Sequence, residues 1–230
     1  MIKIKQFFET ETSTYTYIIH DEKSKEAAII DSVYGYSEVY LKYISEKNLN
    51  LKYILETHIH ADHTTDAHLL RQKTGAKVAF SKNANTSCQD IYLEDNDKLM
   101  LGEFNILTIE TFGHTNTCLS FFVDNKYIFT GDALLINGSG RTDFQDGNPN
   151  SLYDSIMKIY NLADDTLIYP AHDYNGKKYS TVKEQRESNS RINISTSRDD
   201  FIHTMNNLNL PDPKHIKRSV PENLNCGNRD

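Results

Sequence analysis

The sequence has no long apolar run and no excess of positive charge. None of its hydrophobic runs approaches the roughly 18 residues that a membrane-spanning helix needs, and residues 1–10 lack the long apolar region of a secretory signal. Acidic residues outnumber basic ones by 32 to 25, for a net charge of −7, whereas nucleic-acid and anionic-membrane binders need a basic face. These absences predict a soluble protein, cytoplasmic or organellar after removal of a leader, with no nucleic-acid or membrane partner.

Cysteines are few, and glycine-rich phosphate loops are missing. The three cysteines, Cys88, Cys118 and Cys226, form no CxxC pair, and an odd number scattered over the chain is not typical of a disulfide framework. A reducing compartment therefore fits. Cys118 lies in an alternating run typical of a strand, which favours a buried cysteine over a catalytic thiol. Neither GxGxxG nor GxxxxGK[ST] occurs, so we expect no nucleotide or flavin cofactor.

A linker between two halves is also missing. The 230 residues, of which 38% are hydrophobic, suffice for one sizeable core. We therefore expect a single domain over residues 1–230. Prolines at positions 211, 213 and 221 predict that residues 210–230 form an irregular C-terminal tail laid against this domain.

The sequence does contain a dense group of metal-binding residues. Residues 57–63 read THIHADH and directly follow the hydrophobic segment 51–55. Positions i and i+2 of an extended segment project to one side, so His58 and His60 can converge on one centre. Asp62 and His63 can then turn back toward the same pocket. Imidazole together with carboxylate suits zinc, iron, manganese or nickel.

Three further candidate ligands follow predicted strands downstream. His114, Asp132 and His172 close the apolar or β-branched runs 106–109, 127–129 and 166–169. Loops at strand ends are where protein scaffolds present catalytic groups. The sequence thus predicts that seven candidate ligands meet at one site.

The periodicity of the chain predicts two similar halves. In the first half, strands are expected at residues 2–8, 14–19, 27–31, 51–55 and 77–81, and helices at 37–47 and 64–74. The second half repeats this plan, with strands at 105–110, 118–123, 127–130 and 167–169 and helices at 150–162, 182–189 and 199–208. Two sheets packed face to face, with helices outside, would bring the strand-end loops to one edge.

The ligand pattern resembles that of the metallo-β-lactamase superfamily. Its HxHxDH motif, followed by a distant His, an Asp and a last His, is matched by residues 58–63, His114, Asp132 and His172. The resemblance spans most of the chain. It implies an α/β fold, the αββα sandwich of two packed mixed sheets with helices outside. It also implies a metal-dependent enzyme, most often a hydrolase in which two bridged metals activate a water.

Three stretches resemble more closely the persulfide dioxygenases, also called sulfur dioxygenases or the ethylmalonic encephalopathy protein family. They are residues 131–145 (GDALLINGSGRTDFQ), residues 169–174 (YPAHDY) followed by Gly176, and residues 220–227 (VPENLNCG). The resemblance implies oxidation of glutathione persulfide, or a related low-molecular-weight persulfide, by O2 to sulfite and thiol, with one iron(II) per chain. It implies His58, His114 and Asp132 as the iron ligands, a set that leaves positions open for sulfur and oxygen.

The residues of a second metal site are also present. His60, Asp62, His63 and His172 are second-shell groups if the chain is a dioxygenase and ligands if it is a hydrolase. The alternative function is therefore a glyoxalase II type hydroxyacylglutathione thioester hydrolase with a dinuclear metal site. A metal-holding sensor without enzymatic activity is a third hypothesis. Ligand types alone do not decide between iron and zinc.

A site for the carrier thiol should contain guanidinium groups, because glutathione has two carboxylates that a guanidinium binds in a fork. Arg141, Tyr174 and Arg191 match positions that resemble the family's thiol-carrier site. Arg141 follows the glycine-rich segment 138–140, which lets the backbone approach a substrate closely. The carrier, whether glutathione, coenzyme A or another thiol, stays open, and a homodimer is possible.

Overall fold

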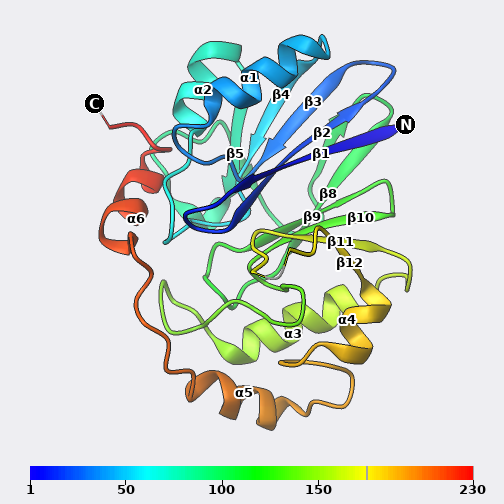
Figure 1. Cartoon of the computed structure of the whole chain (residues 1–230), viewed down its shortest axis with the longest axis vertical. Coiled ribbons are helices and arrows are strands. Elements are labelled where there is room, and N and C mark those ends of the chain that lie inside the picture. Colours follow the sequence, from blue (N-terminus) through cyan, green and yellow to red (C-terminus); the bar gives the residue numbers. More distant parts are fainter. Residues whose placement is uncertain (175, 230) are drawn as a thin grey trace.

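Two six-stranded sheets face each other in a computed structural model that describes residues 1–174 and 176–229 (Figure 1). The first sheet has the strand order β1-β2-β3-β4-β5-β6. Its strands are β1 (Ile2–Glu9), β2 (Thr14–Asp21), β3 (Glu26–Ile30), β4 (Asn50–Leu55), β5 (Lys77–Ser81) and β6 (Ile91–Leu93). The helices α1 (Ser37–Glu46) and α2 (Ala67–Thr74) cover its outer face (Figure 1).

The second sheet has the strand order β12-β11-β10-β9-β8-β7. Its strands are β7 (Lys98–Leu101), β8 (Phe104–Glu110), β9 (Leu119–Val123), β10 (Tyr127–Gly131), β11 (Leu167–Pro170) and β12 (Ser180–Thr181). The helices α3 (Pro149–Tyr160), α4 (Val182–Ser188) and α5 (Arg198–Asn206) cover its outer face (Figure 1). Both sheets mix parallel and antiparallel pairs. The αββα sandwich expected from the sequence is thus confirmed.

The core has three layers of apolar side chains, one between the sheets and one under each group of helices. Between the sheets, the rings of Tyr17 and Phe129 meet edge to face with centroids 5.0 Å apart. Tyr40 and Leu70 pack under α1 and α2, and Ile156 packs under α3. Because both faces of the sheets are covered, all eight residues of β2 are buried, and the strand shows no simple alternation of apolar and polar residues.

The helices begin and end at residues with suitable capping chemistry. Before α3, the Asn148 side chain accepts hydrogen bonds from the backbone N–H groups of residues 150 and 151, and Pro149 occupies the first helical position. Gly75 ends α2 with a positive φ of 73°. In the described part of the chain, no helix combines the length and the apolarity needed to cross a membrane.

The helix α2 begins at Ala67, three residues later than the pattern predicts. The preceding residues make tertiary contacts instead. Asp66 accepts hydrogen bonds from the backbone N–H groups of Gly35 and Ser37, and the Thr65 N–H donates to the Asn223 side chain. The short strands β6, β7 and β12 were not expected either, since runs of two to four residues have no clear period.

The prediction of an irregular tail over residues 210–230 is wrong for the middle of that segment. Residues Ile216–Leu224 form the helix α6, which lies along the edge of the sandwich (Figure 1). Pro221 lies inside this helix, where it removes one backbone hydrogen bond. The helix buries Ser219 and Asn223 against the body of the protein, and hydrogen bonds of the Asn223 side chain to residues 60–65 hold its end.

The expectation that the cysteines form no disulfide is also wrong. Cys88 and Cys226 form a disulfide whose Cα atoms lie 6.1 Å apart, although 138 residues separate them in sequence. The spacing of cysteines could not show this pair, because α6 brings the two residues together only in the folded chain. Cys118 is free and buried, as predicted.

Candidate metal centre

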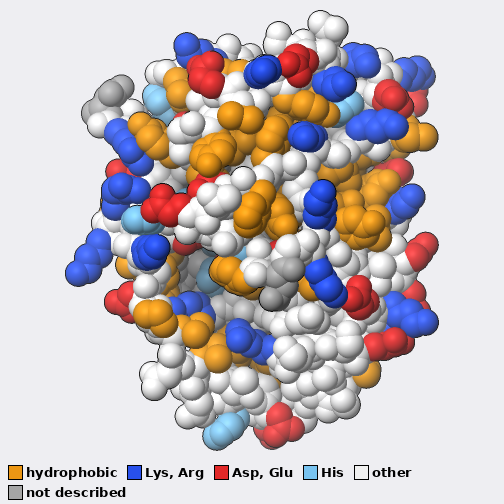
Figure 2. Space-filling view, in the orientation of Figure 1, with side chains coloured by type: hydrophobic (Ala, Val, Ile, Leu, Met, Phe, Trp, Pro, Cys, Tyr) orange, Lys and Arg blue, Asp and Glu red, His pale blue; other side chains and the backbone are white. Residues whose placement is uncertain are grey.

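The seven candidate ligands gather at one edge of the sandwich, where the strands of both sheets end. Residues 58–63 follow β4, His114 follows β8, Asp132 follows β10 and His172 follows β11. A pocket of about 520 Å³ opens over them. Figure 2 looks into a hollow in the middle of this face, where histidine side chains are visible. The structure therefore brings together all seven candidate ligands that the sequence predicted.

His58, His114 and Asp132 form one compact set of possible ligands. One donor atom from each lies within 4.8 Å of the others. His114 Nε2 lies 3.5 Å from Asp132 Oδ2, and the rings of His58 and His114 have centroids 5.0 Å apart. All three residues line the pocket, so an ion held by them would remain accessible to a substrate.

Hydrogen bonds on the outer ring nitrogens orient these two imidazoles. His114 Nδ1 donates to the backbone oxygen of Arg141 at 2.6 Å. His58 Nδ1 lies 3.0 Å from Thr57 Oγ1, and the Thr57 hydroxyl proton is already donated to Asp31 Oδ2 at 2.9 Å. The proton between Thr57 and His58 must therefore come from His58 Nδ1. In both histidines the Nε2 lone pair is left for the pocket, as metal ligation requires.

A second set surrounds the first. His60, Asp62 and His63 also offer donor atoms within 4.8 Å of one another. His172 Nε2 lies 3.6 Å from both Asp62 Oδ2 and Asp132 Oδ1, while its Nδ1 faces the backbone oxygen of Ser13 at 3.2 Å. His172 thus lies between Asp62 of this second set and Asp132 of the first.

Burial and mutual repulsion act on the charges of these groups. Burial, together with the neighbouring histidines, holds the pKa of His58 and of His60 well below the ordinary histidine value, so both rings stay neutral. Burial alone would raise the pKa of Asp132, but the neighbouring histidines lower it below its usual value. Burial would lower the pKa of His172, but the Asp132 and Asp62 carboxylates raise it above the ordinary histidine value. Neutral His58 and His60 beside an ionised Asp132 are the protonation states that a metal ion needs.

Several buried side-chain atoms that could bind a metal ion have no hydrogen-bond partner among the described residues. They are His60 Nδ1, His60 Nε2, His63 Nε2 and Asp132 Oδ1. Unpartnered buried polar atoms are costly, and a cation would satisfy lone pairs of this kind. Asp132 Oδ1 belongs to the first set and the histidine nitrogens belong to the second, so the residues present fit a metal ion in either set.

Sequence reasoning missed two carboxylates that support the metal-binding loop. Asp31 Oδ1 accepts from the Thr57 N–H at 2.7 Å and lies 3.2 Å from His60 Nε2. Glu56 accepts hydrogen bonds from Thr65 and Ser32. Both carboxyl groups are buried. A charged residue at the end of a fully buried strand was the available signal, because such a group needs partners in the adjoining loops.

Arg141 lines the pocket, but its fork is bound within the chain. Its Nε and Nη2 donate to the two carboxylate oxygens of Asp143 at 2.7 and 2.6 Å. Nη1 donates to the backbone oxygen of Pro211 at 2.7 Å. The sequence predicts that this guanidinium binds a substrate carboxylate. In the structure it binds the Asp143 carboxylate instead.

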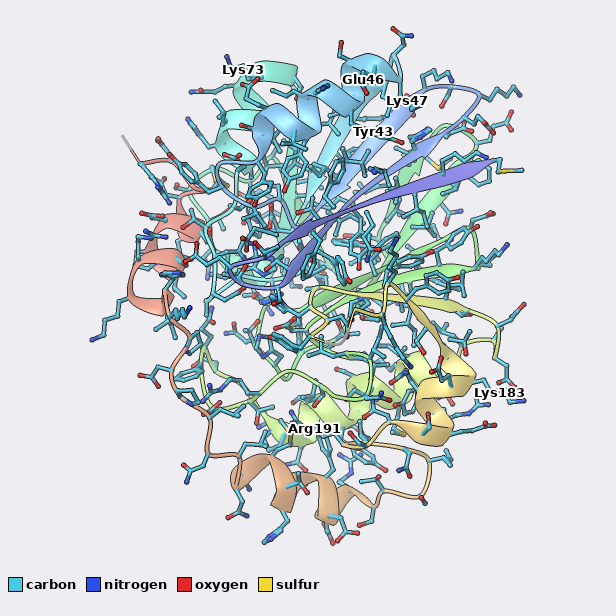
Figure 3. All side chains as sticks on the ribbon, viewed as in Figure 1. Tyr43, Glu46, Lys47, Lys73, Lys183 and Arg191 are labelled. Carbon is cyan, nitrogen blue, oxygen red and sulfur yellow. A yellow bond between two sulfur atoms is a disulfide. The ribbon has the colours of Figure 1, made fainter. Side chains whose placement is uncertain are left out.

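The other two predicted substrate-binding residues, Arg191 and Tyr174, also line the pocket. Among the described residues, the Arg191 side chain donates one hydrogen bond, from Nη1 to the backbone oxygen of Ser139 at 3.0 Å. Figure 3 shows Arg191 on the α3–α5 side of the molecule. Tyr174 is 72% exposed, and its ring lies nearly parallel to that of His172, with an angle of 9° between the planes.

Gly140 allows the pocket wall to approach the metal centre. A Cβ atom at this position would lie 2.5 Å from the backbone oxygen of Asp132 and 2.8 Å from the ring of His114. Both contacts are too short for any side chain. The glycine-rich segment predicted to approach a substrate thus also packs against two candidate ligands.

Comparisons with known proteins identify several relatives. The sequence profile of the metallo-beta-lactamase superfamily matches residues 10–172. The chain is 42% identical to persulfide dioxygenase ETHE1 of Homo sapiens, over 98% of this chain and 89% of the human protein. It is 32% identical to glyoxylase B2 of Dictyostelium discoideum, over 98% of this chain and 91% of that protein. The crystal structure of ETHE1 from Myxococcus xanthus superposes with a TM-score of 0.95 at 41% identity, covering 98% of this chain and 100% of that one.

Proposed function

The chain belongs to the persulfide dioxygenases of the metallo-beta-lactamase superfamily, and we propose that it oxidises a low-molecular-weight persulfide with O2 at one iron ion. It is an oxidoreductase that acts on persulfides. In the balanced reaction, a persulfide, O2 and water give a thiol, sulfite and two protons. The outer sulfur of the persulfide loses four electrons, and O2 accepts them.

The observation that carries the proposal is the geometry of His58, His114 and Asp132. Two imidazoles and one carboxylate converge at the floor of an open pocket, with the outer nitrogen of each imidazole fixed by an acceptor. Iron bound there would supply the redox chemistry and adjacent positions for sulfur and oxygen. The protein's part is to hold the three ligands and to keep one side of the site open.

The remaining four candidates are proposed to support this site rather than to bind a second ion. Asp62 Oδ2 accepts a hydrogen bond from Thr14 Oγ1 at 3.3 Å and lies 3.1 Å from His63 Nδ1. This carboxylate oxygen already has partners in the protein. His172 Nε2 faces both Asp62 and Asp132, so it can help to orient the Asp132 carboxylate.

For the carrier thiol, we propose glutathione bound through Arg191. Its guanidinium has donors that the described residues do not use, and burial lowers its pKa from the usual arginine value, which marks a cation that gains from an anionic partner. Tyr174 would cover the ligand at the pocket mouth, and Arg141 would shape the wall. A volume of about 520 Å³ falls in the range that encloses a ligand of drug-like size and suits a tripeptide better than coenzyme A.

The homodimer and the cytoplasmic location remain predictions. The argument for a reducing compartment from unpaired cysteines no longer applies, because Cys88 and Cys226 form a disulfide.

The second candidate function is thioester hydrolysis of the glyoxalase II type. All the ligands of a dinuclear centre are present, and a relative that is 32% identical carries the name glyoxylase B2. The 42% identity to the human persulfide dioxygenase favours the first function.

The test is metal analysis of anaerobically purified protein, combined with oxygen uptake on glutathione persulfide and with hydrolysis of S-lactoylglutathione. We expect one iron per chain, oxygen consumption and sulfite. Two zinc ions per chain, with thioester hydrolysis and no oxygen uptake, would replace this proposal with the hydrolase.

A further inference from the structure

The end of α6 and the residues after it, 223–227, contact the metal-binding loop from a distant part of the sequence. Asn223 is 1% exposed. Its Nδ2 donates to the backbone oxygens of His60 and His63 at 2.8 and 2.9 Å, and its Oδ1 accepts from the Thr65 N–H at 2.8 Å. We call residues 223–227 the clamp.

These three hydrogen bonds occupy backbone groups that no strand or helix serves. Residues 60–65 lie between β4 and α2, and His60, His63 and Thr65 are buried. Buried backbone groups need partners, and one amide supplies two donors and one acceptor. Asn223 is therefore a positioning residue for the loop that carries His58, His60, Asp62 and His63.

The backbone of the clamp lies directly on the same loop. The Cys226 oxygen accepts from the His68 N–H at 2.9 Å, at the start of α2. A Cβ atom on Gly227 would lie 2.0 Å from the backbone oxygen of Thr65. A shift of the clamp would thus disturb both the loop and the start of the helix after it.

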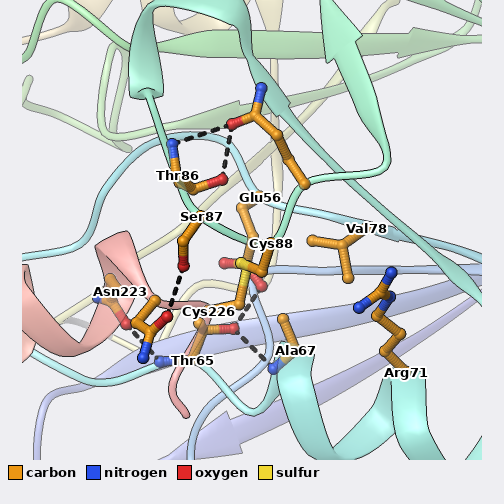
Figure 4. The surroundings of a disulfide bond; sticks show 12 residues. Glu56, Thr65, Ala67, Arg71, Val78, Thr86, Ser87, Cys88, Asn223 and Cys226 are labelled. Atoms are coloured by element: carbon orange, nitrogen blue, oxygen red, sulfur yellow. Dashed lines mark hydrogen bonds between the residues drawn. A yellow bond between two sulfur atoms is a disulfide. The ribbon is translucent and has the colours of Figure 1, made fainter.

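The disulfide fastens this clamp to the segment between β5 and β6. Figure 4 shows Cys88 and Cys226 beside Thr65, Ala67 and Asn223. The neighbouring Ser87 adds two contacts, from its N–H to the Leu224 oxygen at 3.0 Å and from its Oγ to Asn225 Oδ1 at 2.5 Å. Cys226 is fully buried, whereas Cys88 is partly exposed.

From this arrangement we propose that Cys88–Cys226 is a thiol-exchange site that controls how firmly the clamp holds the metal-binding loop. With the disulfide closed, the clamp is held by the Asn223 hydrogen bonds at one end and by the bond from Cys226 to Cys88 at the other, and the metal is retained. With the disulfide open, residues 223–227 separate more easily from the loop, and metal leaves faster. The inference rests on the metal-binding role of the loop proposed above, and not on persulfide oxidation.

The exchange chemistry needs only a low-molecular-weight thiol. Its thiolate attacks the sulfur of Cys88, the partly exposed cysteine of the pair, an S–S bond forms to Cys88, and Cys226 leaves as a thiolate. A second thiolate then attacks the mixed disulfide, which frees Cys88 and releases the oxidised carrier. The two thiols lose two electrons and the protein disulfide gains them. Thiol is also a product of the proposed reaction, so accumulating product would open the site.

The experiment measures metal release from the full-length protein. Protein loaded anaerobically with Fe²⁺ is mixed with ferrozine, with and without prior reduction by dithiothreitol that is then removed, and the measurement is repeated with Zn²⁺ and a zinc chelator. We expect release about tenfold faster after reduction, because groups that orient metal ligands typically change metal affinity by about ten- to a hundredfold. Cys88→Ser should release metal at the fast rate in both states.

Matched substitutions distinguish the loss of the hydrogen bonds between the clamp and the loop from a general loss of stability. Asn223→Asp keeps the shape of the side chain but removes both donors to the loop, so it should release metal quickly even with the disulfide closed. Asn225→Asp, on the same turn, keeps the acceptor for Ser87 and should behave as wild type. Hydrogen exchange of metal-free protein should show faster exchange at residues 60–68 after reduction, with the strands of the core unchanged.

Equal release rates and equal exchange in the two redox states would overturn the proposal, as would three free thiols by alkylation in protein never exposed to reductant. Because zinc release reads only metal binding, a positive result here would stand even if the protein proved to be a hydrolase. A failure here would leave the dioxygenase proposal intact.

Discussion

The backbone oxygen of Arg141 accepts a 2.6 Å hydrogen bond from His114 Nδ1. The residue expected to bind substrate through its side chain therefore contacts a candidate metal ligand through its main chain. Its guanidinium is bound to Asp143, and the N–H of the preceding Gly140 donates to the backbone oxygen of Asp132 at 2.7 Å, which fixes the main chain beside the carbonyl.

Replacing Asp132 by Ala should abolish metal binding and activity. Asp132 is the one carboxylate of the proposed ligand set, and it lies close to both His114 and His172. Metal content after anaerobic loading checks this directly. Asp146→Asn is a suitable control, because Asp146 contacts the exposed Asn116 side chain instead. Retention of a full equivalent of iron by Asp132→Ala would refute the ligand assignment.

Thr57→Val should weaken metal binding by about ten- to a hundredfold, as for other groups that orient a ligand. The change removes the hydroxyl that accepts from His58 and donates to Asp31, so the His58 ring loses its fixed orientation. Thr57→Ser keeps the hydroxyl and should stay close to wild type. Competition titrations with a chelator measure the difference, and equal affinities for the two variants would contradict the prediction.

Arg191→Ala should lower kcat/KM for glutathione persulfide by roughly ten- to a hundredfold, since a hydrogen-bonded charge pair contributes about 1.5–3 kcal/mol. The loss should lie mainly in KM, with normal metal content. Arg141→Ala should have a smaller effect on KM, because its fork is already bound to Asp143. Steady-state kinetics of the two variants decide between them, and a larger KM effect from Arg141→Ala would reverse the assignment.

Asp21→Asn should destabilise the protein at neutral pH and progressively less in acid. Burial would raise the pKa of Asp21, but hydrogen bonds from the Lys23 and Ser24 N–H groups lower it to about 2. A folded-state pKa below the unfolded value of about 3.9 gives stability that is present above pH 4 and lost as the pH falls through 2. The expected difference at pH 7 is about 1–2 kcal/mol. Urea unfolding at pH 7 and pH 3 measures it, and a constant difference would contradict this origin.

The metal centre could be predicted from the sequence because its ligands follow strands with clear periods. Each of His58, His114, Asp132 and His172 lies directly after an apolar run, so fixing the sheets also fixes their meeting point. The pairing of Arg141 with Asp143 has a local signal in the sequence, because the two opposite charges are two residues apart in one loop. The position of Arg141 close to a candidate ligand favoured the prediction that it binds substrate.

The clamp could not be predicted in this way. Prolines at 211, 213 and 221 favour an irregular chain, and the end of the helix is held by hydrogen bonds between the buried Asn223 side chain and residues far away in sequence. The disulfide has the same origin, with 138 residues between its cysteines. Local patterns carry no information on contacts of this range.

The contact between Asn223 and Thr65 also fixes an order of events during synthesis. Asn223 is added 158 residues after Thr65, which at about 5–20 residues per second takes roughly 8–30 seconds. During that time the metal-binding loop is outside or leaving the ribosome without its last backbone partners. Nascent chains stalled before α6 should therefore bind metal poorly, and loading of the centre should be a late, post-translational event.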